Sequence, residues 1–217
     1  MISLSFEQPR GRPLSILCLG AHSDDIEIGC GGTILRLIKE LGNVSFYWVV
    51  FSSNAIRRSE AEKSARDFLR NAGQKTVVVK DFKDGFFPYF GADVKDYFEK
   101  LKLEVNPDLI FTHYRLDLHQ DHRLLSDLTW NTFRSHTILE YEILKWDGDL
   151  GSPNTFFHLS RQVCARKISC LMKNFPSQRD NHWFNQETFQ SLLQIRGIES
   201  NAPENRAEAF YCRKLRF

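Results

Sequence analysis

The sequence predicts one α/β domain, built on a doubly wound, mostly parallel sheet with helices on both faces. Short apolar runs alternate with amphipathic segments at helical spacing along the first 135 residues, a pattern typical of βαβ units. The chain has 217 residues, of which 42% are hydrophobic, and this is enough for one sizeable core. We expect that core over about residues 14–135, followed by a C-terminal extension over about residues 136–217.

The predicted strands of the core are near-continuous apolar runs, as expected for strands buried on both faces. They cover residues 13–21, 44–52, 75–82 and 106–114. Helices are predicted between them over residues 32–42, 59–73 and 93–105, and the first two end on glycine. Beyond Asp121 the pattern is looser. We expect helices there over 122–133, 161–175 and 186–197, and strands over 137–144, 155–160 and 207–217.

This topology also predicts where a ligand binds. Open parallel sheets bind ligands beyond the carboxyl ends of their strands, at the point where the strand order reverses. In an order such as 3-2-1-4-5, the first and fourth strands are neighbours at that point. Polar clusters accompany the ends of both strands: His22, Asp24, Asp25 and Glu27 for the first, and His113, Asp117, His119, Asp121 and His122 for the fourth. We therefore expect the two clusters to face each other.

Imidazoles and carboxylates of this kind suit a divalent metal of the zinc type, bound by three protein ligands with one position left open. His22 and Asp25 are three residues apart in a predicted turn, so both can converge on one ion. His119 and His122 would share one face of a helix; only one of them need bind the metal, and the other could act on a substrate. Asp24 is the natural candidate for a general base, although the residue types alone leave Asp24 and Asp25 interchangeable.

The glycine cluster GCGG, at residues 29–32, has a different interpretation. It does not fit the G-x-G-x-x-G or Walker patterns, and the carboxylates before it would repel a pyrophosphate. We expect these glycines to allow a tight turn and close packing of a helix against the sheet. An acidic turn that is merely solvated, or that complements a helix dipole, is the alternative for either polar cluster taken alone.

Composition limits the classes of partner and the compartment. The net charge of +2 is far from that of a dedicated nucleic-acid binder. Five scattered cysteines without a C-x-x-C pair favour reduced thiols and a cytoplasmic setting. The N-terminus has no apolar segment typical of a signal peptide, and the longest apolar runs are too short to span a bilayer.

Several of these segments resemble one known family, the LmbE-like or PIG-L-type N-deacetylases. The stretch AHSDDIEIGCGGTI resembles the family's A-H-P-D-D motif, and HQDHR resembles its H-P-D-H motif. The segment RRSEAEKSA, with Arg57 and Glu60, resembles its R-x-x-E segment, and RGIESNAPENRAEAFYCRKL its closing stretch. The similarity runs from about residue 14 to the C-terminus. Ser23 and Gln120 stand where the family usually has proline.

The resemblance implies a Rossmann-like fold and removal of an acetyl group from N-acetylated amino sugars, with bound Zn²⁺ or another divalent ion such as Fe²⁺. It implies His22, Asp25 and His122 as metal ligands and Asp24 as general base. It implies His119 as the residue that stabilises the oxyanion or protonates the amine. Asp121 would orient an imidazole, and Arg57 would lie near the substrate. The family also often forms symmetric oligomers.

The function we expect is therefore metal-dependent hydrolysis of an N-acetyl group on an amino sugar, with release of acetate. Residues 161–217 carry ten Lys and Arg residues against five Asp and Glu, which favours an anionic substrate such as a nucleotide-linked sugar. The alternatives are a metal-dependent esterase or phosphoesterase on the same fold, and a non-catalytic nucleotide- or sugar-binding module. The aromatic segment Phe82–Phe90 either packs in the core or borders the pocket.

Overall fold

The computed structural model describes residues 3–6 and 8–216, and its centre is a seven-stranded sheet in the order β3-β2-β1-β4-β5-β7-β6. The parallel strands are β1 (Leu14–Gly20), β2 (Val44–Val50), β3 (Gln74–Val79), β4 (Leu109–His113) and β5 (Thr137–Tyr141). Strands β6 (Thr155–His158) and β7 (Ala207–Cys212) are added antiparallel to β5. The predicted α/β fold class is confirmed, and the first five strands have the order that was assumed for a doubly wound sheet.

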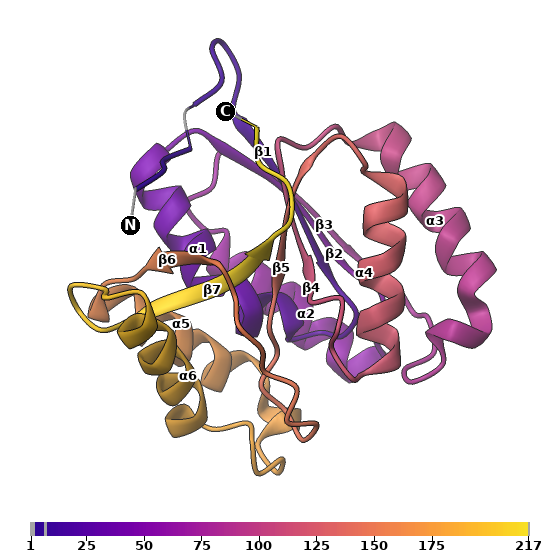
Figure 1. Ribbon diagram of the computed structural model, residues 1–217. Coiled ribbons are helices and arrows are strands. Elements are labelled where there is room, and N and C mark those ends of the chain that lie inside the picture. Colours follow the sequence, from indigo (N-terminus) through magenta and orange to yellow (C-terminus); the bar gives the residue numbers. More distant parts are fainter. Residues whose placement is uncertain (1–2, 7, 217) are drawn as a thin grey trace.

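Helices cover both faces of this sheet (Figure 1). On one face lie α1 (Asp25–Leu41), α2 (Ala55–Phe68) and α5 (Arg161–Asn174), and on the other lie α3 (Gly91–Glu104) and α4 (Gln120–Thr132). Helix α6 (Gln186–Glu199) packs on α5 and β7. Alternate residues of β1 point to the two faces: Ile16 and Cys18 join one apolar core, and Leu17 and Leu19 join the other.

The structure corrects the predicted start of helix α1. The helix begins at Asp25 instead of residue 32, so the glycines lie inside it and form no turn. Their lack of a side chain is nevertheless used for close packing, as expected. A Cβ on Gly29 would lie 2.2 Å from the ring of Tyr141, and one on Gly32 would lie 2.5 Å from Leu159. A glycine run is a strong turn signal in a sequence, but here contacts with β5 and the C-terminal region hold it in a helix.

Other element boundaries also differ from the prediction; α2, for example, ends at Phe68 instead of residue 73. Helix α2 begins at Ala55 instead of residue 59, because the side chain of Asn54 accepts a hydrogen bond from the backbone N–H of Arg57 at 2.9 Å and caps the helix. Strand β7 ends at Cys212, short of the predicted end at residue 217; Cys212, opposite Leu139 of β5, is its last paired residue.

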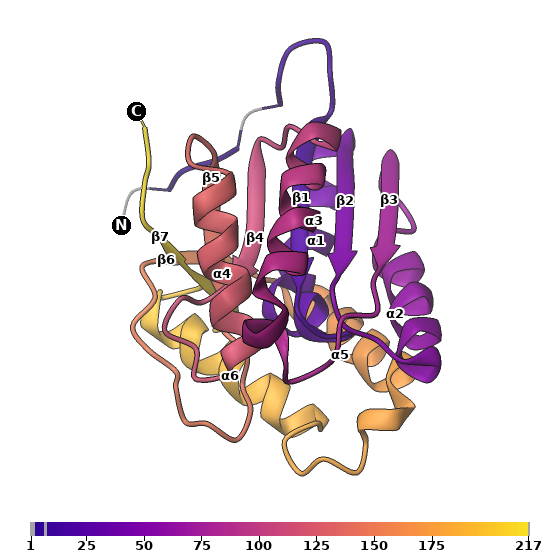
Figure 2. The same ribbon diagram turned by 90° about the vertical axis from the view of Figure 1, so that its right-hand side faces the viewer.

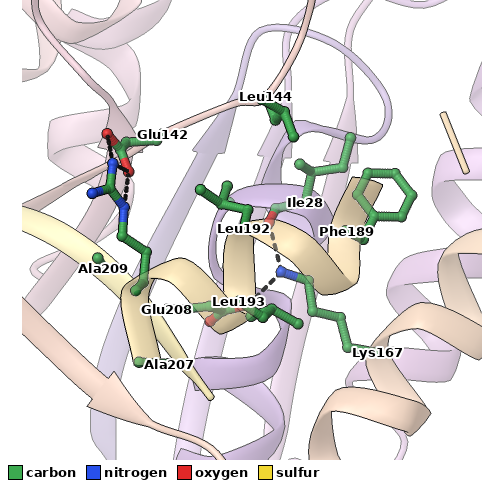
Figure 3. Close-up of a pocket in the computed structure, with 12 residues that line it drawn as sticks. Ile28, Glu142, Leu144, Lys167, Phe189, Leu192, Leu193, Ala207, Glu208 and Ala209 are labelled. Atoms are coloured by element: carbon green, nitrogen blue, oxygen red, sulfur yellow. Dashed lines mark hydrogen bonds and ion pairs between the residues drawn. The ribbon is translucent and has the colours of Figure 1, made fainter. Parts of the chain in front are cut away.

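The C-terminal region is joined to α1 by a buried ion pair. The Nζ of Lys167 lies 2.6 Å from Oε1 of Glu208 and donates to the carbonyl oxygen of Ile28, also at 2.6 Å. The Glu208 carboxylate in turn accepts the backbone N–H groups of Gly32 and Thr33 at 2.8 and 2.6 Å. Figure 3 shows Lys167 between Ile28 and Glu208 in a small pocket lined by α1, α5, α6 and β7. These contacts fix the helix that carries Asp25 at its N-terminus.

The carboxyl ends of the parallel strands all lie at one edge of the sheet. In Figure 2 the arrowheads of β1, β2 and β3 point downward, and the loops that follow the parallel strands gather below the sheet. The short 3-10 helices η1 (Phe87–Phe90) and η2 (Pro176–Gln178) contribute to the same region, through Phe87 and Ser177. Within the described part of the chain, no helix is long and apolar enough to cross a membrane.

Candidate active site

The candidate site lies beyond the carboxyl ends of β1 and β4, which are neighbours in the sheet. His22 follows β1, and Asp25 is the first residue of α1. The turn between them is closed by the backbone N–H of His22, which donates to Oδ2 of Asp25 at 2.6 Å. His119 caps the N-terminus of α4, and His122 lies in its first turn. The structure thus brings together the two polar clusters, which lie about a hundred residues apart in the chain.

Three side chains from these clusters form a compact triangle of donor atoms. His22 Nδ1 lies 3.1 Å from His122 Nε2 and 3.3 Å from Asp25 Oδ2, and His122 Nε2 lies 3.5 Å from Asp25 Oδ2. Ligands at zinc distances in a tetrahedral site are about 3.3 Å apart, as follows from bond lengths near 2.0–2.2 Å. The spacing and the chemistry of these three donors therefore fit one divalent cation.

The side chains around the triangle favour a cation at its centre. Burial disfavours the charged imidazole of His22, but the carboxylates of Asp25, Asp121 and Asp84 outweigh it and raise the pKa of His22 well above its usual value. Burial and the nearby His113 lower the pKa of His122 to about 3, so His122 is neutral at neutral pH, the form that binds metal. The negative potential that favours a proton on His22 also favours a metal ion.

Asp117, a member of the second polar cluster to which the sequence assigned no role, orients His122. Its Oδ2 lies 2.9 Å from Nδ1 of His122, and this pairing leaves Nε2 directed at the triangle. Asp117 is itself held by Lys145 at 3.0 Å and by the backbone N–H of His119 at 2.8 Å. The sequence analysis did not identify Lys145 as part of the site. Its position just after β5, at the same edge of the sheet, could have indicated this.

Asp121 has other principal partners. Its two carboxylate oxygens accept the backbone N–H groups of Gly85 and Phe87 at 2.7 and 3.0 Å, and Oδ2 lies 3.5 Å from Nε2 of His22. Asp121 therefore mainly fastens the Phe82–Phe90 segment to α4, while Asp117 is the closer partner of an imidazole. Phe87 of this segment is buried and stacks on His22 at 6.2 Å between ring centres, so the segment both packs in the core and borders the site.

That segment also contributes Asp84, which was not a candidate from the sequence. Its Oδ1 lies 3.1 Å from Nε2 of His22, and its side chain is 74% exposed. His22 thus has Asp25 and His122 on one ring nitrogen and Asp84 on the other. A carboxylate on the outer nitrogen can accept its proton and keep the inner nitrogen free as a ligand.

His119 and His113 differ in burial and in their hydrogen bonds. His119 is half-buried, with its ring centre 4.8 Å from that of His22, and its Nδ1 accepts the backbone N–H of Asp121. Burial and the charge of His22 lower the pKa of His119, and in the neutral ring Nε2 then carries the proton. The Nε2 of His113 instead accepts the backbone N–H of Ala21 at 2.9 Å. Since that lone pair is occupied, we expect His113 to pack beside Asp25, whose Oδ2 lies 3.3 Å from the same nitrogen, and not to bind the ion.

Asp24 forms an ion pair with a residue of α2 through one of its two carboxylate oxygens. Its Oδ1 lies 2.8 Å from a guanidinium nitrogen of Arg57, while Oδ2 is buried and has no hydrogen-bond partner among the described residues. Arg57 is also 3.2 Å from Glu60 and 3.4 Å from Ser177, and it lies over the ring of Phe175. Glu60 accepts both the backbone N–H and the hydroxyl of Ser177, at 2.9 and 2.6 Å. The C-terminal region therefore reaches the site through Arg57.

The fold and the site together define a doubly wound α/β protein with a His/Asp cluster able to hold a divalent cation at its switch point. The model of the family described as PIG-L, GlcNAc-PI de-N-acetylase, matches residues 17–133, more than half of the chain. The chain belongs to this family.

Solved structures of the same fold have little sequence identity to the chain. A conserved protein of Thermus thermophilus matches with a TM-score of 0.71 and 17% identity, over 94% of this chain and 96% of that one. The N,N'-diacetylchitobiose deacetylase of Pyrococcus horikoshii matches at 0.65 and 21%, over 92% and 84%. The 4-carboxy-2-hydroxymuconate hydratase of Pseudomonas putida KT2440 matches at 0.74 and 17%, over 94% and 97%. A deacetylase and a hydratase thus share this fold, and the fold alone does not define the reaction.

Proposed function

We propose that the chain is a metal-dependent hydrolase that removes the N-acetyl group of an amino sugar and releases acetate. The observation that carries the proposal is the triangle of His22, Asp25 and His122, whose donor atoms lie 3.1–3.5 Å apart beside a carboxylate with an unpartnered oxygen. Membership of a family described as a de-N-acetylase supports the choice of an amide over an ester or a phosphoester.

The three residues of the triangle would hold the metal, with Zn²⁺ or Fe²⁺ as candidates for a site of two imidazoles and one carboxylate. Such an ion, when bound with an open position, polarises a carbonyl group and lowers the pKa of water. Asp117 and Asp84 would orient the two imidazoles from behind.

The remaining side chains would move protons. The free Oδ2 of Asp24 accepts a proton from the attacking water, whose oxygen adds to the acetamido carbonyl carbon. The neutral His119 donates from Nε2 to the developing oxyanion, the kind of contact that is worth about 3–4 kcal/mol. When the C–N bond breaks, the leaving nitrogen takes up the proton that Asp24 received from the water, and the acetic acid that forms loses its own proton and leaves as acetate.

The contacts of Arg57 indicate a role other than the substrate contact that the family resemblance implies. Its guanidinium donors are directed at Asp24, Glu60 and Ser177, and its side chain is only 15% exposed. We propose that Arg57 positions Asp24 and leaves Oδ2 free for the proton. From its place beside Asp24, Arg57 would also lie near the polar part of a substrate.

The experiment that tests the function is acetate release from a panel of N-acetylated sugars, glycosides and nucleotide-linked sugars. Turnover should vanish with a chelator and return with Zn²⁺ or Fe²⁺, and His122→Ala should lose both metal and turnover. Ester and phosphoester substrates in the same panel test the alternative hydrolases. A purified protein that holds no metal, binds sugar and releases no acetate would be a binding module, and the proposal would be wrong.

We also propose the cellular compartment in which this reaction takes place. All five cysteines are free thiols, and four of them are buried, which supports a reducing, cytoplasmic compartment. We also propose a nucleotide-linked sugar as the substrate and a homo-oligomer as the assembly; the substrate panel tests the first and sedimentation analysis the second.

A further inference from the structure

A buried lysine lies behind the candidate metal site, in the segment between β5 and β6. The side chain of Lys145 is only 7% exposed, and its Nζ lies 3.0 Å from Asp117, 2.6 Å from Asp149 and 3.5 Å from Asp147. Burial disfavours the charged amine, but Asp117 and Asp149 outweigh it and raise the pKa of Lys145. The lysine is therefore charged at neutral pH, and the proposed reaction does not use this charge.

Lys145 and Asp149 join the segment after β5 to the segment after β4. Oδ2 of Asp149 accepts a hydrogen bond from Nζ of Lys145 and another from the backbone N–H of Leu118 at 2.7 Å. The same Nζ reaches the carboxylate of Asp117, the residue before Leu118. The two residues thus hold both the side chain of Asp117 and the backbone next to it. We call Lys145 and Asp149 the clasp.

The contacts of the clasp bear on which oxygen of Asp117 faces the candidate metal site. Oδ1 of Asp117 lies 3.0 Å from Nζ of Lys145 and accepts the backbone N–H of His119 at 2.8 Å. Oδ2 is left for Nδ1 of His122, at 2.9 Å. Because donors lie on both oxygens, rotation of the carboxylate would break at least one of these contacts. The direction of His122 Nε2 toward the triangle therefore depends on Lys145 through one intermediate residue.

A second buried ion pair holds the same segment without reaching Asp117. Arg196 of α6 lies 2.8 Å from Glu142 and donates to the carbonyl oxygen of Gly151 at 3.0 Å. The backbone N–H of Gly151 also donates to Glu142, at 3.0 Å. The two ends of the segment are thus joined independently of the clasp. Lys145 is not needed to close the segment, and its contact with Asp117 calls for a separate role.

We propose that Lys145 is a positioning residue of the metal site, which acts through Asp117 to hold His122 in its metal-binding orientation. The inference rests on the proposed function for the presence of a divalent ion, and on the contacts of the clasp for the role of Lys145. Asp149 supports Lys145 in this role. The alternative is an ion pair that only stabilises the fold, because a buried carboxylate without a cation is costly.

The test is a double-mutant cycle of Lys145→Met and Asp117→Ala, with Zn²⁺ affinity measured by competition with a chromophoric chelator. Lys145→Met should weaken Zn²⁺ binding about tenfold, the lower end of the range for residues behind metal ligands. In the Asp117→Ala background the same change should alter the affinity by less than about twofold, because the carboxylate through which Lys145 acts is absent. An effect on stability alone would weaken binding equally in both backgrounds.

Arg196→Met is the matched control, because it removes the cation of the other buried ion pair in the same segment. It should lower the free energy of unfolding and leave the Zn²⁺ affinity unchanged. The visible absorption of the Co²⁺-loaded protein gives a second readout, which depends on the geometry around the ion. Lys145→Met should change this spectrum, and Arg196→Met should not.

Three results would overturn the inference: unchanged Zn²⁺ affinity in Lys145→Met, an equal loss in both backgrounds of the cycle, or an equal loss in Arg196→Met. If Lys145→Met does not fold, Asp149→Asn takes its place in the cycle, since it weakens the clasp but keeps an oxygen for the N–H of Leu118. Zn²⁺ that binds with the expected differences but supports no acetate release would refute the proposed function alone. A wild-type chain that binds no divalent ion would refute both.

Discussion

Asp24 and Asp25 are adjacent in the chain, yet their carboxylates have opposite surroundings. Burial raises the pKa of Asp25, but the nearby His122, His113 and His22 outweigh it and hold that pKa well below the usual range. For Asp24, burial dominates over Arg57, and the pKa is raised. An ionised Asp25 suits a metal ligand, and a more basic Asp24 suits a proton acceptor. This contrast supports the proposed division of roles.

The first prediction tests that division. Asp24→Asn should leave about one metal ion bound per chain but lower kcat by roughly 10²–10⁴, the usual contribution of a positioned base. Metal analysis of the purified variant and initial-rate kinetics measure the two quantities. His122→Ala is the contrasting variant, which should lose the metal as well. Normal turnover in Asp24→Asn would exclude it as the base.

The second prediction concerns Asp117, which lies 2.9 Å from Nδ1 of His122. Asp117→Asn keeps an oxygen acceptor but removes the charge that makes His122 a stronger ligand, so metal affinity should fall about 10–100-fold. Competition with a chromophoric chelator measures the affinity. Asp127→Asn, at an exposed position of α4, is the control and should have no effect; equal affinity in both variants would contradict the proposed orientation of His122.

At the scale of the element, helix α1 combines a metal ligand with close packing. Its first residue is Asp25, and its next turns carry glycines that contact the sheet and α2 without side chains. The ring of Tyr141 lies where a Cβ of Gly29 would be, and its hydroxyl donates to the carbonyl oxygen of Leu19 in β1 at 2.6 Å. Tyr141 therefore cannot move aside without breaking a buried hydrogen bond.

Gly29→Ala should accordingly lower the free energy of unfolding by about 1–3 kcal/mol, because overpacking outweighs the gain in helix propensity. Gly91→Ala is the matched control: it begins α3 and has no atom within 4 Å of an added Cβ. That variant should be neutral or stabilised by up to about 1 kcal/mol. Urea denaturation of both variants measures the difference, and similar stabilities would show that α1 can shift to make room.

At the scale of the whole molecule, the C-terminal region completes the sheet and supports the site. Strand β7 pairs with β5, and α5 carries Lys167 to the middle of α1. Beyond α5, Ser177 reaches Arg57 and Glu60. This region lies outside residues 17–133, which the family model matches, so it couples a part of the chain beyond the shared segment to the candidate base.

Lys167→Met should lower the free energy of unfolding by roughly 3 kcal/mol or more, because it leaves the buried carboxylate of Glu208 without its cation. Lys173→Met is the control in the same helix. Lys173 pairs with Asp67 but is 58% exposed, so its loss should cost less than about 1 kcal/mol. Chemical denaturation measures both values. Adding Glu208→Gln should restore part of the stability lost in Lys167→Met, and no restoration would argue against an unpaired charge as the cause.

Much of the fold could be predicted from local patterns. Apolar runs and helical spacing predicted the parallel strands and the helices on both faces, because a strand buried on two faces must be apolar along its length. The meeting of His22, Asp25 and His122 also followed from topology, since parallel strands end at one edge. The predicted start of α1 was wrong, because glycines favour turns unless tertiary contacts hold them in a helix.

The sequence by itself determined the alternation of strands and helices and the two polar clusters that follow β1 and β4, because these depend on residues close together in the chain. Only the tertiary structure decided what surrounds each cluster: Asp117 and Lys145 behind His122, Asp84 beside His22, and Arg57 with Ser177 beside Asp24. These pairings join separate loops and helices. Their geometry depends on how the packed core places one segment against another, which no local pattern of residues encodes.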